Sequence, residues 1–366
     1  MASKNFPPAP SRRHLLGLGL GLAAGALLGA PALVRAQGRP IKLLQAAPAN
    51  LPLWSVPFLA EDLGLYKEEG LAVERIKLNN GPAAVTALLA GEGAAVMATP
   101  GEMLSATARG QRMVALISYT RTDAYTVLVS KAFADRHKVT AASPLKDREA
   151  ALKATKGVRI GITAPGSATD LMARAALKQV GLDPARDAQI VPLQSSANAV
   201  AAMANNAVDA TITLSPFTEQ TISEFGAVPL LAVATGELRE PARLQGQCLQ
   251  AKPEVVQANQ EAFAAVVRAD LRALRMLMEK PDEARDALRR TRFANIKDDI
   301  WPTVWRNQLA TFSSPFVTRD GMKAWVESGT IQGNPDPAKF NYDSVIDMRF
   351  VNEGLKKLNW QVSDKR

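Results

Sequence analysis

Cysteine and histidine are nearly absent from this 366-residue chain, which has one cysteine and two histidines. Cys248 alone forms no disulfide within the chain, and we expect it to be a small buried apolar side chain. Metal centres built from His and Cys need several such ligands. The motifs H-E-x-x-H, G-x-S-x-G, C-x-x-C and the P-loop are also missing. We therefore expect no metal, no cofactor and no enzymatic activity.

Acidic residues are missing from the first 36 positions, which contain Lys4, Arg12, Arg13 and Arg35. Subtracting this +4 from the chain's +9 leaves +5 for the remaining residues. In those residues no basic stripe is interleaved with aromatic side chains, which make up only 5% of the chain. The sequence therefore predicts no nucleic-acid partner.

The N-terminal segment has the three parts of an export signal. Arg12 and Arg13 precede 20 residues without formal charge, at 15–34, and Val34-Arg35-Ala36 ends in small or aliphatic residues. The paired arginines predict the twin-arginine route, cleavage after about Ala36 and a periplasmic location. A retained membrane anchor is the alternative, because about 20 apolar residues can span a bilayer.

Beyond the signal, strands and helices alternate in two successive patterns. The first predicts strands at 41–46, 71–78, 94–98 and 113–119, with helices at 54–63, 83–90 and 101–109. The second predicts strands at 125–130, 155–162, 189–192 and 209–214, with helices at 169–180, 198–205 and 217–225. The last third is largely helical, with helical spacing over 253–280 and another helix from Pro281 to Arg290. Such alternation is typical of mainly parallel sheets covered by helices.

Several segments resemble a known family in order along the chain. They are Glu61-Asp62-Leu63-Gly64-Leu65-Tyr66-Lys67-Glu68-Glu69-Gly70-Leu71, Ala87-Leu88-Leu89-Ala90-Gly91-Glu92, Lys156-Gly157-Val158-Arg159-Ile160-Gly161, Asn206-Ala207-Val208-Asp209-Ala210 and Pro253-Glu254-Val255-Val256. Together they resemble periplasmic substrate-binding proteins of the nitrate, sulfonate and taurine type, whose relatives bind thiamine-pyrimidine precursors. The chain departs from that pattern at Gly93-Ala94-Ala95, where an Asp is usual.

The resemblance implies a type II periplasmic binding protein fold, with two α/β lobes closing on a ligand cleft. Lobe I would contain residues 39–120 and 245–366, and lobe II residues 121–244. The implied function is capture of a sulfonate, nitrate, taurine or heteroaromatic solute for an ABC importer permease, by a monomeric binding protein. A binding lobe of a periplasmic sensor, or less plausibly an enzyme on the same fold, is the alternative.

Ligands of open α/β sheets sit beyond the carboxyl ends of the strands, where helix N-termini face the crevice. Five strand–helix junctions of this chain meet that description, at 47–54, 79–82, 99–101, 166–169 and 195–198. The candidate ligand-binding residues are Asn50, Trp54, Asn80, Thr99, Tyr119, Arg121, Gly166, Ser167, Thr169, Ser196, Asn198 and Phe217.

Each candidate also has a purely structural interpretation. Arg121 follows a predicted strand and would pair with an anionic group, or it is a solvated arginine of the crossing between lobes. Ser167 and Thr169 fit a helix N-cap equally well. The aromatic candidates, and Tyr125 beside them, would stack on a ring or pack in the core. Glu102 and Asp170 would disfavour a strongly anionic ligand if they face the cleft.

Overall fold

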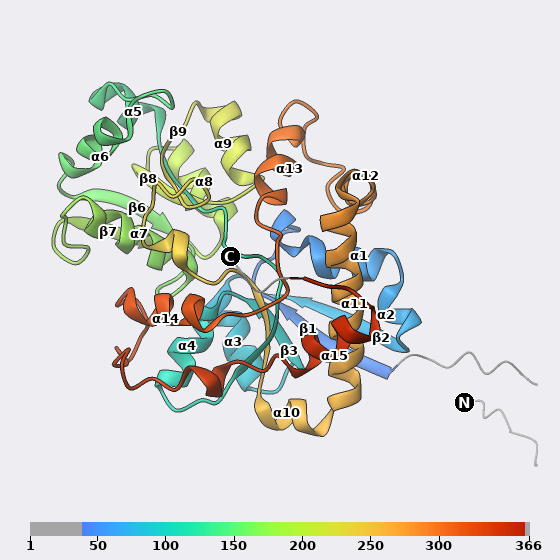
Figure 1. The fold of residues 1–366 in the computed structure, drawn as a ribbon. Coiled ribbons are helices and arrows are strands. Elements are labelled where there is room, and N and C mark those ends of the chain that lie inside the picture. Colours follow the sequence, from blue (N-terminus) through green and yellow to red (C-terminus); the bar gives the residue numbers. More distant parts are fainter. Residues whose placement is uncertain (1–38, 363–366) are drawn as a thin grey trace, which may run out of the picture. The chain divides into compact units, whose positions relative to one another are not determined.

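Two five-stranded sheets organise the residues that the computed structural model describes, 39–362 (Figure 1). Sheet A has the order β2-β1-β3-β10-β4, and sheet B has the order β7-β6-β8-β5-β9. The strands of sheet A are β1 (Arg39–Gln45), β2 (Leu71–Lys77), β3 (Ala95–Ala98), β4 (Val114–Ser118) and β10 (Cys248–Ala251). Those of sheet B are β5 (Thr126–Val129), β6 (Val158–Ile162), β7 (Ala188–Pro192), β8 (Ala210–Thr213) and β9 (Val228–Ala232).

The two sheets share one topology. In each, the first three strands along the sheet pair in parallel, and the fourth pairs antiparallel with both neighbours. The antiparallel strand is β10 in sheet A and β5 in sheet B, and each is the first strand that the chain forms after leaving the other sheet. The two sheets are thus joined by two crossings, β4 to β5 and β9 to β10.

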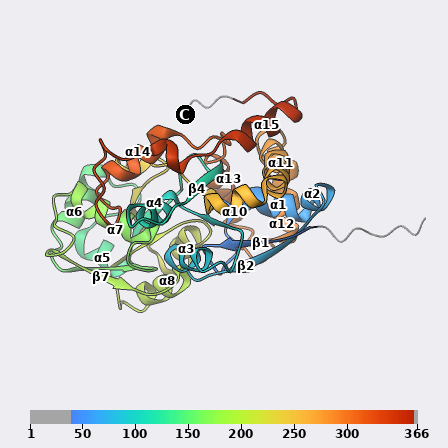
Figure 2. The ribbon, with the colours of Figure 1, turned by 90° about the horizontal axis from the view of Figure 1, so that it is seen from below.

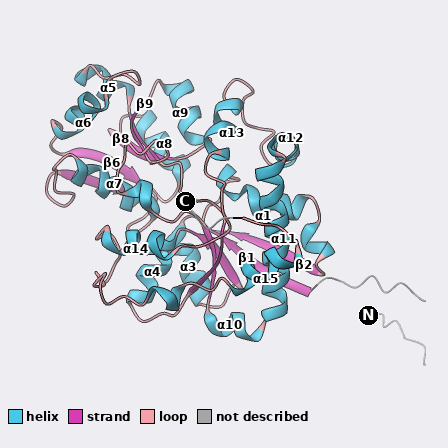
Figure 3. Ribbon diagram, in the orientation of Figure 1, coloured by secondary structure: helices cyan, strands magenta, loops and turns pink. Residues whose placement is uncertain are grey.

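Helices cover both sheets, and Figure 3 separates the two element types by colour. Around sheet A lie α1 (Ser55–Asp62), α2 (Leu65–Glu68), α3 (Gly81–Leu89), α4 (Pro100–Ala108), α10 (Pro253–Ala258), α11 (Gln260–Glu279), α12 (Pro281–Thr291), α13 (Trp301–Leu309), α14 (Arg319–Glu327) and α15 (Arg349–Lys357). Around sheet B lie α5 (Lys131–His137), α6 (Leu145–Lys153), α7 (Ala168–Gln179), α8 (Ser196–Ala204) and α9 (Phe217–Phe225). Short 3-10 helices are η1 (Pro52–Trp54), η2 (Pro241–Arg243) and η3 (Tyr342–Val345).

We call the part around sheet A lobe I and the part around sheet B lobe II. Their bounds stay those predicted from the sequence, 39–120 with 245 onward for lobe I and 121–244 for lobe II. The described residues of both lobes lie in a single compact unit. In Figure 2 the C-terminal helices α14 and α15 run along one side of lobe I, away from α3. No helix of the described residues is long and apolar enough to cross a membrane.

The core of lobe I contains a buried acid. Asp270, on the amphipathic helix α11, is fully buried and accepts hydrogen bonds from the hydroxyls of Tyr66 (2.5 Å) and Tyr119 (2.8 Å). Burial raises the pKa of Asp270 to about 7. The two phenols satisfy the carboxyl group in the interior and connect α11 to α2 and to the end of β4.

The two crossings are hydrogen-bonded to each other. Tyr119 donates its backbone N–H to the Gln247 carbonyl (2.8 Å), and Gly246 donates to the Arg121 carbonyl (3.2 Å). Gly246 is required here, because a Cβ at this position would collide with the backbone of Thr120. The Asp123 carboxylate accepts hydrogen bonds from Thr120 Oγ1 (2.8 Å) and Gln247 Nε2 (2.7 Å). These bonds make the crossings one polar junction between the lobes.

Some elements differ from the sequence expectations. The expected helical run over 253–280 is two helices, α10 and α11, because Asn259 leaves the helical region (φ −133°, ψ 35°) and donates its side chain to the Val255 carbonyl. Helices α5 and α6 and strand β9 were not expected, since their sequences lie in polar or Pro-containing stretches with weak periodicity. The expected helix at 54–63 begins as the 3-10 helix η1.

Candidate ligand-binding cleft

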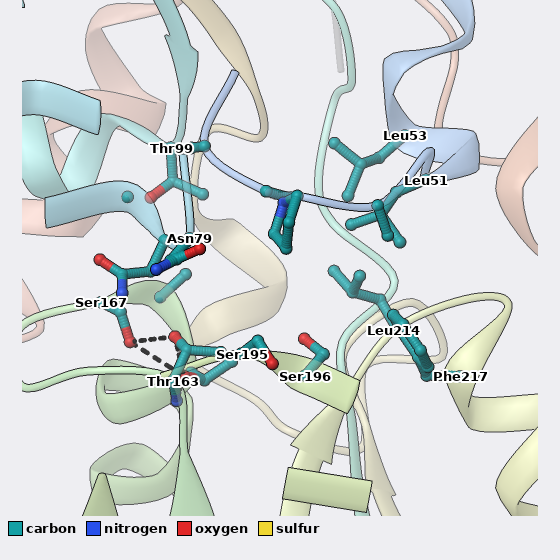
Figure 4. A pocket seen from close by; sticks show the side chains of 18 of the residues that line it. Leu51, Leu53, Asn79, Thr99, Thr163, Ser167, Ser195, Ser196, Leu214 and Phe217 are labelled. Atoms are coloured by element: carbon teal, nitrogen blue, oxygen red, sulfur yellow. Dashed lines mark hydrogen bonds between the residues drawn. The ribbon is translucent and has the colours of Figure 1, made fainter. Parts of the chain in front are cut away.

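A cavity lies between the two lobes and receives side chains from both (Figure 4). Its empty space is about 670 Å³, counting the opening to solvent. From lobe I it is lined by Ala46, Ala47, Pro48, Ala49, Leu51, Leu53, Trp54, Asn79, Asn80, Gly81, Thr99, Glu102 and Gln247. From lobe II it is lined by Tyr125, Thr163, Ser167, Ala168, Thr169, Ser195, Ser196, Ala197, Leu214 and Phe217.

Most of these residues come from the ends of six strands, and Tyr125 and Gln247 lie on the crossings just before β5 and β10. The loops after β1, β2 and β3 supply the lobe I wall, and the loops after β6, β7 and β8 supply the lobe II wall. Helices α3, α4, α7, α8 and α9 begin at these loops. The cavity therefore occupies the place where open α/β sheets hold ligands.

The lobe I wall is mostly apolar and is held by the sheet behind it. Gln45, fully buried at the end of β1, donates through Nε2 to the carbonyls of Ala47 (2.8 Å) and Ala49 (3.0 Å). These bonds fix the loop that carries Leu51, Leu53 and Trp54 into the cavity. Trp54 is only 2% exposed, and within the described structure its Nε1 donates to no acceptor.

The lobe II wall presents hydroxyl groups. Thr163, Ser167 and Thr169 form a triangle, with oxygen–oxygen distances of 3.0 Å for Thr163–Ser167 and Thr163–Thr169 and 2.9 Å for Ser167–Thr169 (Figure 4). Ser167 also caps α7 by accepting the backbone N–H of Asp170 (3.4 Å). The triangle thus combines two roles, because the same hydroxyls hold a helix start and line the cavity.

Glu102 is the charged residue of the cavity lining. It lies in the first turn of α4, is 6% exposed, and accepts hydrogen bonds from the Thr99 hydroxyl and from the backbone N–H of Ala168 in lobe II. Gly81 makes room for it, since a Cβ there would collide with the carboxylate. Burial raises the pKa of Glu102 to about 7, despite those hydrogen bonds, and the nearby Asp123 raises it further.

A second buried acid lies beside the cavity. Asp123 is 6% exposed and faces Thr120 and Gln247, of which Gln247 lines the cavity. Burial raises the pKa of Asp123 to about 6. Tyr125, on the lining, has a pKa well above its usual range because it is buried and lies near both Asp123 and Glu102. The cleft therefore has acidic surroundings.

Basic side chains are missing from this lining. Across the part of the chain that the structure describes, no Lys, Arg or His contributes to the cavity. The same residues contain no group of three or more His, Cys, Asp or Glu side chains placed to hold a metal ion. His137 lies at the end of α5, where its ring packs on Phe133 with centroids 4.5 Å apart. Cys248 is buried on β10 and does not line the cavity.

Seven of the twelve sequence-predicted site residues line the cavity. They are Trp54, Asn80, Thr99, Ser167, Thr169, Ser196 and Phe217. The cavity brings these seven residues together although Trp54 and Phe217 are 163 positions apart in the chain. Asn80 also joins the lobes directly, because its Nδ2 donates to the Gln194 carbonyl of lobe II (3.3 Å).

The other five predicted residues lie outside the lining. Tyr119 points into the lobe I core and bonds Asp270, and Arg121 is exposed on the crossing. Asn50 accepts a hydrogen bond from Lys77 (2.8 Å). Gly166, with φ +74°, lies against Gln332, and Asn198 is exposed with its Nδ2 on the Leu193 carbonyl (2.9 Å).

Among the lining residues that sequence reasoning missed are Thr163, Leu214 and Gln247. Thr163 and Leu214 directly follow strands β6 and β8, so the rule that ligands sit at the carboxyl ends of strands could have found them. Gln247 lies on the return crossing next to Asp123, and nothing in its local sequence marks it.

Two α/β lobes of shared topology, with a lined cleft between them, define the class of protein: this is the two-lobed periplasmic binding protein fold, as the sequence predicted. The model of the NMT1-like family matches residues 51–291. The chain therefore belongs to the NMT1-like family, and it shares its fold with nitrate- and alkanesulfonate-binding proteins, as the sequence predicted. No curated protein matches the chain in sequence.

Solved structures share the fold at low sequence identity. A protein of Bordetella bronchiseptica RB50 is 21% identical with a TM-score of 0.73, and the match covers 88% of this chain and 99% of that one. The periplasmic nitrate-binding protein NrtA of Synechocystis PCC 6803 is 18% identical (TM-score 0.65; coverage 88% and 89%). The alkanesulfonate-binding protein SsuA of Xanthomonas axonopodis pv. citri, bound to MOPS, is also 18% identical (TM-score 0.63; coverage 82% and 96%).

Proposed function

We propose that this chain is an extracytoplasmic solute-binding protein, which captures a small solute between its lobes and delivers it to an ABC import permease. The observation that carries the proposal is the single cavity lined by the strand ends of both sheets. The names of its structural relatives support it, since NrtA is a nitrate-binding and SsuA an alkanesulfonate-binding protein. The solute classes to consider are sulfonates, nitrate, taurine and heteroaromatic compounds.

Capture would work through closure of the lobes. A ligand that contacts both walls favours the closed arrangement by its extra contacts, and a permease can then recognise the closed surface. Chemistry on the bound solute is not part of the proposal, because Cys248 and His137 lie away from the lining. A monomer suffices for this role, since one chain supplies both walls.

A thermal-shift screen tests the proposal directly. A cognate solute at about 100 times its Kd stabilises the folded protein by about 2.7 kcal/mol, and the Tm rises accordingly. Mass spectrometry after incubation should recover that solute unchanged. If no compound from the four classes raises the Tm, solute binding is contradicted, and a chemically altered solute would instead indicate an enzyme.

We also propose that the chain reaches the periplasm by the twin-arginine route and is cleaved after about Ala36. These residues lie outside the described part of the structure, so the proposal depends on the sequence pattern. Replacing both Arg12 and Arg13 by Lys keeps the charge but should stop export. Normal accumulation of the double variant in the periplasm would contradict the route, and N-terminal sequencing of the exported protein checks the cleavage position.

A further inference from the structure

The cleft does not have the composition expected for binding an anion. Its lining has no basic side chain among the described residues and contains the buried carboxylate of Glu102. A second buried acid, Asp123, lies next to Gln247 and raises the pKa of Glu102. A nitrate or sulfonate placed here would meet like charge at low dielectric, which is unfavourable.

Three of the five helices that begin at the cavity are capped by the chain's own oxygen atoms. Asn80 Oδ1 caps α3 by accepting the Ala83 N–H (3.1 Å), and Ser195 Oγ caps α8 by accepting the Asn198 N–H (3.2 Å). At α7, Ser167 caps the helix while the Glu102 carboxylate takes the Ala168 N–H. Helices α4 and α9 have no side-chain cap. Free N–H groups at helix starts attract anions, and the caps weaken that attraction at α3, α7 and α8.

Among the residues that the structure describes, Glu102 has no cationic partner. Its hydrogen bonds come from neutral groups, the Thr99 hydroxyl and the Ala168 N–H. A buried carboxylate without a counter-charge is unfavourable, and its pKa rises for that reason. A positively charged group on the ligand would supply the missing charge at the point where both lobes meet.

The walls also offer faces for a ring. Trp54 approaches the cavity from lobe I, and Tyr125 and Phe217 approach it from lobe II. Aromatic faces attract cations and stack on planar groups. Since only 5% of the chain is aromatic, three such residues on one lining indicate a planar ligand.

We propose that the cleft selects a small planar cation, such as an aromatic ring bearing an amidinium or protonated amine, and that Glu102 determines this preference. The inference rests on the proposed solute-binding function and narrows it to one charge type. A preference for cations would distinguish this chain from the nitrate- and sulfonate-binding proteins that share its fold.

Three probes distinguish the charge types: benzamidinium and benzenesulfonate, which are similar in size, and the smaller anion nitrate. By titration calorimetry at pH 8, benzamidinium should bind with a Kd at least tenfold lower than that of benzenesulfonate, because a hydrogen bond between charged groups in the cavity contributes that much. Benzenesulfonate or nitrate binding as tightly as benzamidinium would overturn the proposal.

Variants then assign the preference to Glu102. Glu102→Gln keeps the shape and removes the charge, so benzamidinium affinity should fall at least about tenfold. Gly81→Ala, which displaces the carboxylate, should give a similar loss. Glu219→Gln is the matched control, since Glu219 lies equally early in α9 and is also 6% exposed but does not line the cavity. Unchanged benzamidinium affinity in Glu102→Gln overturns the assignment.

The pH dependence of benzamidinium affinity tests the role of Glu102 in the unmodified protein. The titratable groups facing Glu102 are Asp123 and Tyr125, with no Lys, Arg or His on the described lining. With a pKa of about 7, Glu102 gains charge between pH 6 and 8, so benzamidinium affinity should rise about tenfold across that interval. A flat or falling profile contradicts the proposal.

The outcomes also separate this inference from the proposed function. If nitrate or benzenesulfonate stabilises the protein and benzamidinium does not, the cleft still binds a solute and only the charge preference is wrong. If neither the probes nor the compounds of the solute screen raise the Tm, both proposals fall.

Discussion

The two walls of the cleft are built differently. The lobe I wall consists of side chains that belong to the core, with Leu51, Leu53 and Trp54 all at most 5% exposed. The lobe II wall combines hydroxyls, of which Ser167 and Ser195 cap helices, with the buried side chains of Tyr125 and Leu214 and a half-buried ring, Phe217. The contrast between Trp54 and Phe217 therefore teaches that ligand contact should be coupled to folding stability more strongly at the first ring than at the second.

The acids of the two lobes differ in the same way. Glu102 and Asp270 of lobe I, and Asp123 at the crossing, are buried and form no ion pair within the described residues, and their pKa values are raised. In lobe II, the pKa of Glu237 is lowered by hydrogen bonds from Arg148. Arg148 thus neutralises one partly buried acid of lobe II, whereas Glu102 of lobe I stands beside the cavity without an ion-pair partner among the described residues.

The largest difference in the free energy of unfolding should appear when the rings on opposite walls, Trp54 and Phe217, are replaced by alanine. Trp54→Ala removes a ring that is 2% exposed, so it should lower the free energy of unfolding by about 3–5 kcal/mol. Phe217→Ala removes a half-buried ring and should lower it by roughly 1 kcal/mol or less. Urea denaturation followed by circular dichroism measures both. Equal losses of free energy in the two variants would mean that both rings contribute equally to the core.

The pH dependence of stability should reflect the two kinds of acid. Because the folded pKa of Glu102 is about 7 and its unfolded value is 4.5, the folded state holds more protons in between. Its stabilising contribution is present below the unfolded pKa and is lost as the pH rises through 7, by up to about 3 kcal/mol. The lowered pKa of Glu237 has the opposite sign, so stability from that acid is lost as the pH falls.

Denaturation curves at pH 5 and pH 8 test this balance. The protein should be more stable at pH 5 than at pH 8, and Glu102→Gln should reduce the difference. Greater stability at pH 8 in the unmodified protein would contradict the raised pKa values of the lobe I acids.

A smaller effect is expected on the hydroxyl wall. Ser167→Ala removes the cap of α7 and one corner of the triangle with Thr163 and Thr169, so stability should fall by about 1 kcal/mol. Ser196→Ala is the control on the same wall, since Ser196 lies inside the first turn of α8 and its neighbour Ser195 supplies the cap. Its stability should change by at most about 0.5 kcal/mol. Equal losses from the two serines would argue against the capping role.

The sequence predicted most of the architecture because the strands and their following helices carry strong local signals. Asn80 and Ser167 cap helices at positions that were readable from the pattern. The repeated alternation predicted two α/β lobes, but it did not predict strands β9 and β10 or the antiparallel place of β5 and β10 in their sheets. Local patterns thus located the strand ends, and the strand ends located the cleft.

What the sequence could not give is the direction of side chains near the crossings. Tyr119 stands at the end of β4, but it turns to Asp270, which lies 151 positions away on α11. Glu102 faces the cavity only because Gly81, on another loop, leaves room for it. Such contacts depend on packing between distant segments, which a local pattern does not encode.

The smallest effect should come from Arg121, the residue that the sequence marked for pairing with an anion. Its side chain is exposed and does not line the cavity, and it joins the crossing through its backbone, which bonds the Thr311 carbonyl (2.8 Å) and the Gly246 N–H (3.2 Å). Arg121→Ala keeps those bonds, so stability should change by at most about 0.5 kcal/mol. Calorimetry should find the Kd for benzamidinium unchanged within about twofold. A large loss of affinity for benzenesulfonate would bring Arg121 back as an anion-pairing residue, and with it the anionic solutes that the acidic lining disfavours.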